Sequence, residues 1–515
     1  MRTDRINDLA AALRESITAV CGPDKGLALQ NAWLACSCWL AGLGFIFSMT
    51  ACKVGPDYSA PELVAPEAWE ARAAGDAIES TAMPLPPENL WWHELEDPQL
   101  DRLVEQALEA NPNLQAARSR VREARALVGI AESGLLPQVG GRANYAEIEL
   151  SERTPILEQF IRRGQVDTRQ NLYDVGFDAQ WEIDVFGGTR RAVEAGVARA
   201  AAAEASLADA RLSLQMEVIR QYIHLRLAQR QLAILQRQSE LQEQIVALAQ
   251  ERLSSGVGAA LDLRRAQALE HRIRAQVPGF RIQKSAAIYR ISVLTDEEPS
   301  ELSERLDEVE ALPQPPDLVP LGVPGDVLRR RPDIHQAEMR LKAATAEIGV
   351  KVAQLFPRFA LTGGAGLQAS RFARLFESGS GTWTILPGVS WAVFQGGRIR
   401  AEVEASGFQE DQAFQSYRQT VNQAVAEVET ALTRYGLSFQ TRESLRSMVD
   451  SQREAAELSK AAHESGVVDF LDVLEAQRQL SKGSLQLAEA RGETLLALAA
   501  LQKALGGGWD TRLDG

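Results

Sequence analysis

Few residues of this chain have side chains and spacings suited to covalent or metal chemistry. All four cysteines fall within the first 52 residues, so nothing beyond Lys53 can form a disulfide or a thiolate metal site. The five histidines show no ligand spacing, and the sequence contains no nucleophile elbow and no phosphate-binding loop. It therefore gives little support to an enzyme and predicts no catalytic residue, cofactor or metal.

The charge balance narrows the possible partners. The chain has 69 acidic and 55 basic side chains, and its net charge is −14. No basic stripe outweighs this acidic balance, which argues against nucleic acid as a partner. With cysteines confined to the N-terminus, the rest of its 515 residues must be held together by packing alone.

An uncharged apolar run at residues 32–51 ends in Met49-Thr50-Ala51-Cys52. A run of about 20 residues is long enough for a transmembrane helix, but an export signal has the same apolar region followed by small residues before a cut. The final four residues resemble a bacterial lipobox, in which cleavage leaves a lipid-bearing cysteine. We therefore expect residues 1–51 to be a lipoprotein signal peptide, whose long charged beginning points to a start farther downstream. Cys52 would carry a diacylglycerol and an N-acyl chain.

Residues 52–96 are expected to form the lipid anchor and an N-terminal tether. The segment Lys53-Val-Gly-Pro-Asp-Tyr-Ser-Ala-Pro is interrupted by prolines, as in an extended linker. Residue 53 is Lys and not Asp, which under the sorting rule known for enteric lipoproteins implies release to the outer membrane. The sequence thus predicts a bacterial outer membrane protein that is lipid-anchored and extends into the periplasm.

The chain contains two related halves. The motif SGVGAALDLRRAQ at 255–267 recurs 210 positions later as SGVVDFLDVLEAQ at 465–477. A period of this size indicates two copies of one large unit and not a solenoid. We expect a first structural repeat at 97–312, a second at 323–507 and a C-terminal tail at 508–515. Three more pairs of identical residues are each separated by 220 positions: Pro112/Pro332, Gly129/Gly349 and Pro137/Pro357.

Long stretches without proline, rich in Ala, Leu, Gln, Glu and Arg, predict long helices. From 188 to 253 the apolar residues step by threes and fours, as on one packed face of a helix. At 1.5 Å per residue a helix of about 65 residues would be about 95–100 Å long, so it needs partners along its whole length. In each half the helix should turn back at a glycine, Gly256 and Gly466, which predicts two long helical hairpins.

Alternation of apolar and polar residues predicts two strands in each half. From Tyr173 to Val185 every odd position is apolar over 13 residues, and the counterpart lies at 383–393. Shorter alternations occupy 139–145 and 359–367. A strand that crosses a bilayer needs about 9–11 residues with apolar side chains outward. The alternative is the half-buried strands of a soluble sheet.

Four strands cannot close a barrel, and open strand edges in hydrocarbon cost several kcal/mol per unpaired backbone group. We therefore expect a homo-oligomeric barrel, continued by a helical cylinder. The strand–strand loops, 149–171 and 368–381, differ in length, as expected of turns outside the cell where nothing packs against them. Carboxylates on the even positions predict a mildly acidic lumen that favours cations: Asp174, Asp178, Glu182 and Asp184.

These features resemble the outer membrane factor family, the TolC-like channels, and in particular its lipid-anchored NodT/OprM-type branch. The likeness covers nearly all of residues 49–509. It rests on short segments in a fixed order: Cys52-Lys-Val-Gly-Pro-Asp-Tyr, Trp91-Trp92 with Asp97-Pro-Gln-Leu, Asn111-Pro-Asn-Leu, Trp181-Glu-Ile-Asp-Val-Phe-Gly, Arg330-Arg-Pro-Asp-Ile and Ala504-Leu-Gly-Gly-Gly-Trp509.

The resemblance implies an α+β membrane protein with a two-fold internal repeat. Three chains with four strands each would form a 12-stranded outer membrane β-barrel, continued by a long periplasmic α-helical barrel. It also implies a function, the exit duct of a tripartite RND-type efflux system for small molecules. In such a system the homotrimer docks on a periplasmic adaptor (a membrane fusion protein) and an inner membrane pump.

The resemblance further implies a periplasmic gate in the second hairpin. On that match Leu471 adds an apolar constriction, while Asp472 and Glu475 form rings of carboxylates on one helix face. Like charges at a narrow pore require compensating cations. Our hypothesis is that Arg264 or Arg265 of the first hairpin pairs with these carboxylates and holds the tips shut. The alternative is that all four are ordinary solvated charges.

Two further alternatives concern the hairpin tips and the overall function. Gly256-Val257 and Gly466-Val467 resemble the family's adaptor-docking turns, although they could equally be mere helix caps. A lipid-anchored periplasmic adaptor is also a coiled-coil hairpin, but it lacks long alternating strands and a two-copy plan. The duct of a type I protein-secretion system remains a second candidate. The sequence identifies neither the substrate nor the pump.

Overall fold

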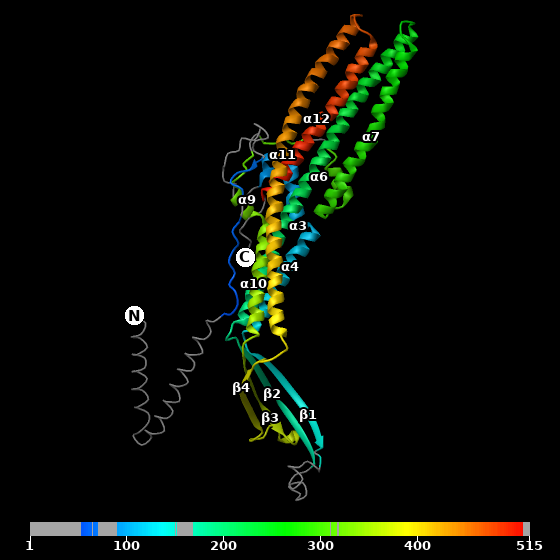
Figure 1. The fold of residues 1–515 in the computed structure, drawn as a ribbon. Helices are drawn as coiled ribbons and strands as arrows, with labels where there is room; N and C mark the ends of the chain where they lie inside the picture. The colour runs from blue at the N-terminus through cyan, green and yellow to red at the C-terminus, as the bar shows by residue number, and fades with distance from the viewer. Residues whose placement is uncertain are drawn as a thin grey trace, which may run out of the picture. The chain divides into compact units, whose positions relative to one another are not determined.

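The computed structural model describes residues 53–63, 65–70, 90–149, 151, 168–308, 311–316 and 319–507. They form long helices and one antiparallel sheet, grouped in two compact units (Figure 1). The strand-bearing unit includes residues 131–193 and 346–404, and the helical unit includes 57–130, 194–345 and the chain from 405 onward. The predicted signal peptide, Cys52 and Trp509 lie outside the described residues.

The helices are long and the strands few. The first half contains η3 (Trp91–Leu95), α3 (Pro98–Ala110), α4 (Pro112–Ser133), β1 (Gln138–Glu149), β2 (Arg169–Ile183), α6 (Gly188–Ser254), α7 (Ala260–Thr295) and α8 (Pro299–Arg305). The second contains α9 (Pro324–Arg330), α10 (Pro332–Ala353), β3 (Arg358–Ala369), η4 (Phe372–Arg374), β4 (Gly381–Ser390), α11 (Arg398–Glu464) and α12 (Phe470–Ala504). Helices α6 and α11 each span 67 residues, which confirms the predicted helix length. No helix of the described chain is both long and apolar enough to cross a bilayer.

The predicted apolar stripe of α6 is buried. Ile219, Tyr222 and Leu225 are at most 1% exposed, and they belong to a core that also contains Leu495 and Leu498 of α12. A helix that buries one face along a partner is stabilised mainly by this packing, since helix propensity alone contributes little. The helical unit is therefore held by contacts between its hairpins.

Short motifs that support the family resemblance have structural roles in the helical unit. Asp97 caps α3, because its carboxylate accepts hydrogen bonds from the backbone N–H groups of Gln99 and Leu100 at 3.0 and 3.2 Å. The hydroxyl of Tyr222 donates to the other Asp97 oxygen at 2.6 Å. Burial and this hydrogen bond raise the pKa of Tyr222 above its usual range.

The arginine of the second-half motif is equally structural. Arg331 is 6% exposed, and it donates to Asp333 at 2.7 Å and to the carbonyl oxygen of Ala504 at 2.9 Å. A second carboxylate, that of Glu427 in α11, lies 2.6 Å from the same guanidinium. Removing one partner of such a buried network leaves an uncompensated charge, which is strongly destabilising.

The four strands form an antiparallel sheet in the order β1-β2-β3-β4. The predicted apolar faces coincide across the strands, since Phe177 lies opposite Ala365 and Ala365 opposite Trp383. Several residues of this face are largely exposed in the single chain, as a lipid-facing surface requires: Val139 68%, Phe177 67%, Trp383 74%, Ile385 64% and Val389 65%.

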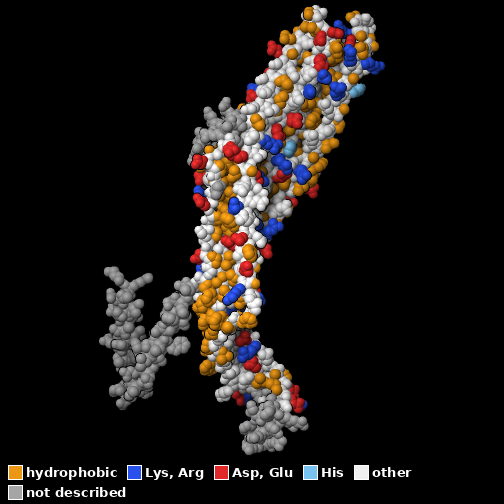
Figure 2. Space-filling model, viewed as in Figure 1, with side chains coloured by type: hydrophobic (Ala, Val, Ile, Leu, Met, Phe, Trp, Pro, Cys, Tyr) orange, Lys and Arg blue, Asp and Glu red, His pale blue; other side chains and the backbone are white. Residues whose placement is uncertain are grey.

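The strand boundaries differ from the prediction at their ends. Strand β2 begins at Arg169, inside the predicted loop, and stops at Ile183, before Val185. Strand β4 ends at Ser390, so the predicted positions Trp391 and Val393 lie beyond it. The alternating pattern extends past the last paired residues because the connections between strands and helices are also apolar, and Figure 2 shows hydrophobic side chains gathered there. The exposed apolar residues of these connections are Leu136, Leu355, Trp391, Val393 and Phe394.

The loop between β3 and β4 is folded, contrary to the expectation that nothing packs against it. It contains the 3-10 turn η4, and Leu375 is 1% exposed. The hydroxyl of Ser380 donates to the carbonyl oxygens of Leu375 and Glu377 at 2.7 and 2.8 Å. The difference in loop length predicted an open turn, whereas one buried leucine and one serine close this loop on itself.

Candidate functional site

Both helical hairpins turn back through the same backbone motif. Gly256 and Gly466 each have φ of +75°, a left-handed conformation that favours glycine. In the first tip the N–H of Val257 donates to Arg252 O at 3.0 Å, and in the second the N–H of Val467 donates to Ala462 O at 2.9 Å. This is the Schellman motif. Val257 and Val467 are each 76% exposed, so both tips present one apolar side chain to solvent.

A small apolar core joins the two hairpins near their tips. Phe470 and Leu474 of α12 pack against Ala249 of α6 and Leu263 of α7, and all four are at most 7% exposed. Burying an aromatic side chain stabilises by about 1.5–3 kcal/mol relative to exposure. The tips of one chain are therefore held together mainly by packing.

A polar contact between the hairpins accompanies this core. The guanidinium of Arg252, at the end of α6, hydrogen-bonds the Nε2 of His463, at the end of α11. The Nδ1 of His463 lies 3.0 Å from Val468 O, and its ring packs on Phe470 with centroids 5.5 Å apart. This contact could not be predicted from the repeat, because Arg252 aligns with Ala462 in the second half.

Asp472, one of the predicted gate residues, also caps its own helix. Its carboxylate accepts a hydrogen bond from the backbone N–H of Asp469 at 3.2 Å, and Asp469 caps Phe470 N in return at 2.7 Å. This reciprocal arrangement is a capping box. Asp472 and Leu471 both lie on the exposed side of α12, while Val473 is buried.

Glu475, the second predicted carboxylate, has a cation on its own helix. Its oxygens accept from Nε and a terminal nitrogen of Arg478 at 2.8 and 2.6 Å, and from Gln479 at 2.7 Å. These hydrogen bonds, first of all those from Arg478, lower the pKa of Glu475 below its usual range. A cation that could compensate the predicted gate carboxylates is thus present on the same helix, three positions from Glu475, and Arg478 was not among the predicted gate residues.

The predicted gate arginines also have partners on their own helix. Arg264 donates to Gln267 at 3.0 Å, and Arg265 lies 4.0 Å from Asp262. Among the contacts of the described chain, neither arginine reaches Asp472 or Glu475. The cross-hairpin pairing is therefore not formed within one chain, and pairing between chains stays a prediction.

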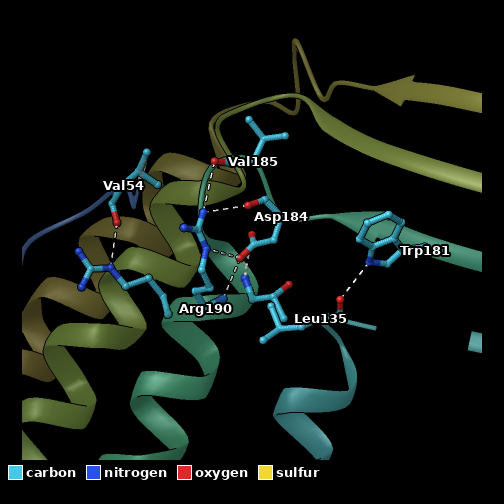
Figure 3. Close-up of polar contacts among 8 residues, drawn as sticks. Val54, Leu135, Trp181, Asp184, Val185 and Arg190 are labelled. Atoms are coloured by element: carbon cyan, nitrogen blue, oxygen red, sulfur yellow. Dashed lines mark hydrogen bonds and ion pairs between the residues drawn. The ribbon is translucent and has the colours of Figure 1, made fainter. Parts of the chain in front are cut away.

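One cation on the polar face of the sheet offsets part of the predicted acidity. Arg142 of β1 donates to Asp174 at 2.7 Å and lies 3.8 Å from Asp178. Asp184 lies beyond β2 and caps α6, where it accepts from the backbone N–H groups of Thr189 and Arg190 at 3.1 and 2.9 Å (Figure 3). The alternation within β2 predicts the carboxylates of that strand but not the arginine that β1 places beside them. Within the described residues no group of His, Cys, Asp and Glu is placed to hold a metal ion.

The residues that follow Cys52 are fixed against the junction between strands and helices. The carbonyl oxygen of Val54, labelled in Figure 3, accepts a hydrogen bond from the guanidinium of Arg191 at 3.1 Å. The same guanidinium donates to Gly55 O at 3.2 Å, and Arg191 is 1% exposed. Gly55 has φ of +86°, and a Cβ there would lie 2.5 Å from the Cα of Gly349. Val54 and Gly55 of the expected tether are therefore packed against this junction, while Cys52 lies outside the described residues.

The two halves share one indole contact at this junction. The Nε1 of Trp181 donates to Leu135 O at 3.0 Å (Figure 3), and the Nε1 of Trp391 donates to Leu355 O at 3.0 Å. Tryptophan with its ring in an apolar layer and its N–H in a polar one is typical of a membrane interface. The end of the sheet next to the helices therefore has the character of an aromatic belt.

Comparisons with known proteins agree with this geometry. Residues 103–295 and 323–507 both match the model of the outer membrane efflux protein family. The chain is 30% identical to the outer membrane protein OprJ of Pseudomonas aeruginosa over 483 residues, which cover 92% of this chain and 96% of OprJ. It is 31% identical to nodulation protein T of Rhizobium leguminosarum bv. viciae over 464 residues, covering 90% and 92%.

Solved structures show the same architecture. The outer-membrane channel OprN is 35% identical and superposes with a TM-score of 0.81, covering 89% of this chain and 100% of OprN. The CmeC outer membrane channel of Campylobacter jejuni, 23% identical, shares the fold with a TM-score of 0.81 over 90% of this chain and 96% of CmeC. The resemblance to the TolC-like outer membrane factors of the NodT/OprM type is confirmed, and the chain belongs to the outer membrane efflux protein family.

Proposed function

We propose that this protein is the outer membrane exit duct of a tripartite efflux system that exports small molecules. The observation that carries the proposal is one sheet with an exposed apolar face, joined in one chain to two hairpins whose first helices have 67 residues each. Such a helix is about 100 Å long at 1.5 Å per residue. That length suits a conduit across a wide aqueous compartment, while the sheet suits the membrane at its end.

The sheet supports a homotrimer. Strands β1 and β4 are the edges of the sheet, and each pairs with only one described strand. An open edge in hydrocarbon leaves backbone groups unsatisfied at several kcal/mol each. Three copies of a four-stranded sheet would close these edges as a 12-stranded barrel. The equal lengths of α6 and α11, and of β1 and β3 at 12 residues each, support the two-fold repeat within the chain.

The hairpin tips are the proposed periplasmic entrance and docking site. Leu471, Asp472 and Glu475 lie on the exposed side of α12, which leaves them available to line a pore with copies of themselves. In this arrangement each Glu475 brings Arg478 with it, so a ring of ion pairs surrounds the pore. The exposed Val257 and Val467 beside their left-handed glycines would receive the adaptor hairpins, and an RND-type inner membrane pump would supply the substrate.

The N-terminal contacts support a lipid anchor at Cys52. Arg191 binds the carbonyl oxygen of Val54, whose N–H donates to Phe186 O at 3.1 Å just beyond the end of β2, so lipid on a cysteine two residues upstream would be attached close to the sheet. Replacing Cys52 with Ser should abolish labelling by radioactive palmitate. Membrane fractionation of the same strain reports whether the outer membrane location depends on that lipid.

The decisive test is single-channel conductance of the purified protein in planar bilayers. We would compare the wild type with Asp472→Asn/Glu475→Gln, since these amides remove the charges while an amide oxygen can still accept the capping hydrogen bond of Asp472. The control is Asp262→Asn, at the first-hairpin position that corresponds to Asp472, and it leaves the candidate gate residue Arg265 in place. Small flickering wild-type currents that grow several-fold only in the second-hairpin variant would support both the channel and its gate.

Other results separate the parts of the proposal. Equal currents in all three proteins would refute the acidic gate and leave the channel intact. Equal enlargement in both variants would place the constriction in both hairpins and contradict the special role of Asp472 and Glu475. A wild type that is recovered as a soluble monomer would refute the duct itself.

The names of the relatives favour small-molecule export over protein secretion. They include a solvent efflux pump protein, a toluene efflux pump protein and a pyoverdine export protein, all from Pseudomonas putida. Their cargoes differ widely, so they indicate the class of system and not the substrate of this chain. Sensitivity of a deletion strain to a panel of solvents, dyes and antibiotics, with rescue by the cloned gene, tests the efflux role.

A further inference from the structure

The apolar face of the sheet ends, on the side away from the helices, in a cluster of four aromatic rings. The rings of Tyr145 and Tyr173 have centroids 4.9 Å apart, Tyr173 and Phe372 are 5.9 Å apart, and Phe372 and Phe376 are 6.3 Å apart. We name these four residues the loop-side aromatic cluster. Phe372 and Phe376 come from the β3–β4 loop, while the tyrosines lie opposite each other on β1 and β2.

The loop holds its shape while leaving its phenylalanines uncovered. The N–H of Leu375 donates to Phe372 O at 3.1 Å, and the buried Leu375 side chain fixes the turn from within. Phe372 and Phe376 nevertheless are 63% and 73% exposed. Two large exposed rings on an ordered turn indicate an interaction surface, because solvent exposure of such a patch is unfavourable.

The same turn is positively charged in an acidic protein. Arg371 and Arg374 are both exposed, and Glu377 is the one acidic residue between 370 and 380. Within the described part of the chain neither guanidinium has a hydrogen-bond or ion-pair partner. The loop therefore has a net charge of +1, whereas the whole chain has −14. Unpaired guanidinium groups beside exposed aromatic rings fit an anionic amphiphile.

The distance from this cluster to the other aromatic belt matches the thickness of a membrane. Tyr173 and Trp181 bound nine residues of β2, and a tilted strand needs about 9–11 residues to cross the apolar layer. Trp181 is fixed at the helix end by its hydrogen bond to Leu135 O. If that end lies at one interface, the loop-side cluster lies at the opposite one, among lipid headgroups.

We infer that the loop-side aromatic cluster, together with Arg371 and Arg374, binds the phosphate-bearing headgroups of outer-leaflet lipids. The inference rests on the proposed membrane-spanning duct. The rings lie at the depth where aromatic side chains gather in membrane barrels, and the arginines bind the phosphates above them. The shorter loop of the second half thus lies on the bilayer and supports each subunit at its rim.

The test measures binding of lipid A, a glycolipid with two phosphates, to the purified trimer in neutral detergent. Lipid A from which the phosphates have been removed is the matched ligand, and inorganic phosphate is the competitor. We expect the wild type to prefer the phosphorylated lipid about tenfold or more. Arg371→Gln/Arg374→Gln should lose most of this preference. Arg281→Gln/Arg453→Gln, which removes two exposed arginines from helices α7 and α11, should retain it.

The apolar part of the surface has its own variant. Phe372→Ser/Phe376→Ser should weaken binding of both lipids to a similar extent, because rings contribute to the acyl region and not to phosphate recognition. An unchanged preference in the loop arginine variant would overturn the inference. So would displacement of lipid A by millimolar inorganic phosphate, which would indicate a site for a soluble anion.

Trimer formation and conductance are recorded on the same preparations, which separates this inference from the proposed function. A conducting trimer that shows no preference for phosphorylated lipid refutes only the lipid surface. A wild type that neither trimerises nor conducts refutes the duct. A conducting arginine variant that has lost the preference supports both.

Discussion

The two hairpin tips have the same turn but different helices after it. Gly256 and Gly466 share a φ of +75°, and Ser255 and Ser465 each donate to a carbonyl of the preceding helix at 2.9 Å. Beyond the turn, α12 begins with a capping box at Asp469, whereas Ala259 before α7 offers no side-chain cap. The turn is therefore a requirement of the hairpin, and the features unique to the second hairpin are candidates for function.

The charges differ in the same way. Glu475 forms a close ion pair with Arg478 at 2.6 Å, while its counterpart Arg265 stands 4.0 Å from Asp262. The second hairpin also supplies Phe470 and Leu474 to the core that joins both tips. The first hairpin supplies Ala249 and Leu263 to the same core, so the two tips differ mainly in their caps and charges.

Removing the aromatic ring of the tip core should have the largest effect. Phe470→Ala replaces a 5% exposed phenylalanine, and such a change costs about 3–5 kcal/mol in a core. We expect the tips of each chain to separate, with faster hydrogen exchange in both hairpin tips and larger bilayer currents.

Leu261→Ala is the matched control for that experiment. Leu261 is 56% exposed and lies in the first turn of α7, where truncation should change stability by no more than about 0.5 kcal/mol. If Phe470→Ala left exchange and currents as they are in the control, the tip core would not be what holds the hairpins together.

Substitutions of the turn glycines test whether the tips are truly equivalent. Gly256→Val and Gly466→Val each place a β-branched residue at positive φ, which costs about 1–3 kcal/mol. No atom lies within 4 Å of a Cβ added at either position, so the new Cβ clashes with no neighbouring group and the cost comes from the backbone conformation. We expect equal losses of local protection in hydrogen exchange. A clearly larger loss in one tip would show that the neighbours, and not the turn, determine its stability.

Much of this architecture could be predicted because long-period patterns determine it. The apolar stripe through Ile219 and Ile223 predicted the buried face of α6, and the alternation around Phe177 predicted the exposed apolar face of β2. Both are repeated many times, so single exceptions do not hide them. The predicted end of β4 was wrong, because apolar residues such as Trp391 continue beyond Ser390, where the strand pairing stops.

Contacts between distant segments could not be predicted. Arg142 and Asp174 lie on different strands, and Arg252 meets His463 across 211 positions. One sequence gives the charge of each residue but not the register that brings two together. Arg478 is different, since three residues on one helix suffice to find it as the partner of Glu475. The family resemblance indicated the two carboxylates as gate residues, and their nearest cation, Arg478, was not part of that prediction.

Exchanging the caps should have a smaller effect of opposite sign in the two hairpins. Asp469→Ala removes the cap of α12 and should destabilise its first turn by about 1 kcal/mol. Ala259→Asp offers α7 the cap that it lacks and should stabilise it by a similar amount. Hydrogen exchange of the amides that follow each cap measures both changes. A null result for Ala259→Asp alone would show that the first turn of α7 cannot adopt the capped geometry.

The pH response of the proposed acidic gate should be the smallest effect. Because Arg478 lowers the pKa of Glu475, the ion pair contributes stability above the ordinary carboxylate pKa and loses it as pH falls through the lowered value. Between pH 8 and pH 5 the pair should therefore stay ionised and wild-type currents should not change through it. Both side chains are exposed and screened by solvent, so the pair contributes little to stability.

Arg478→Gln sharpens that prediction. Without the guanidinium the pKa of Glu475 should rise toward its ordinary range, so that protonation begins at a higher pH and any acid-induced change in current moves upward with it. Arg265→Gln, at the weaker pair of the first hairpin, should leave the pH profile where it is in the wild type. Identical shifts in both variants would mean that the currents respond to the net charge of the tips, and the distinction between the hairpins would then lie in packing and capping alone.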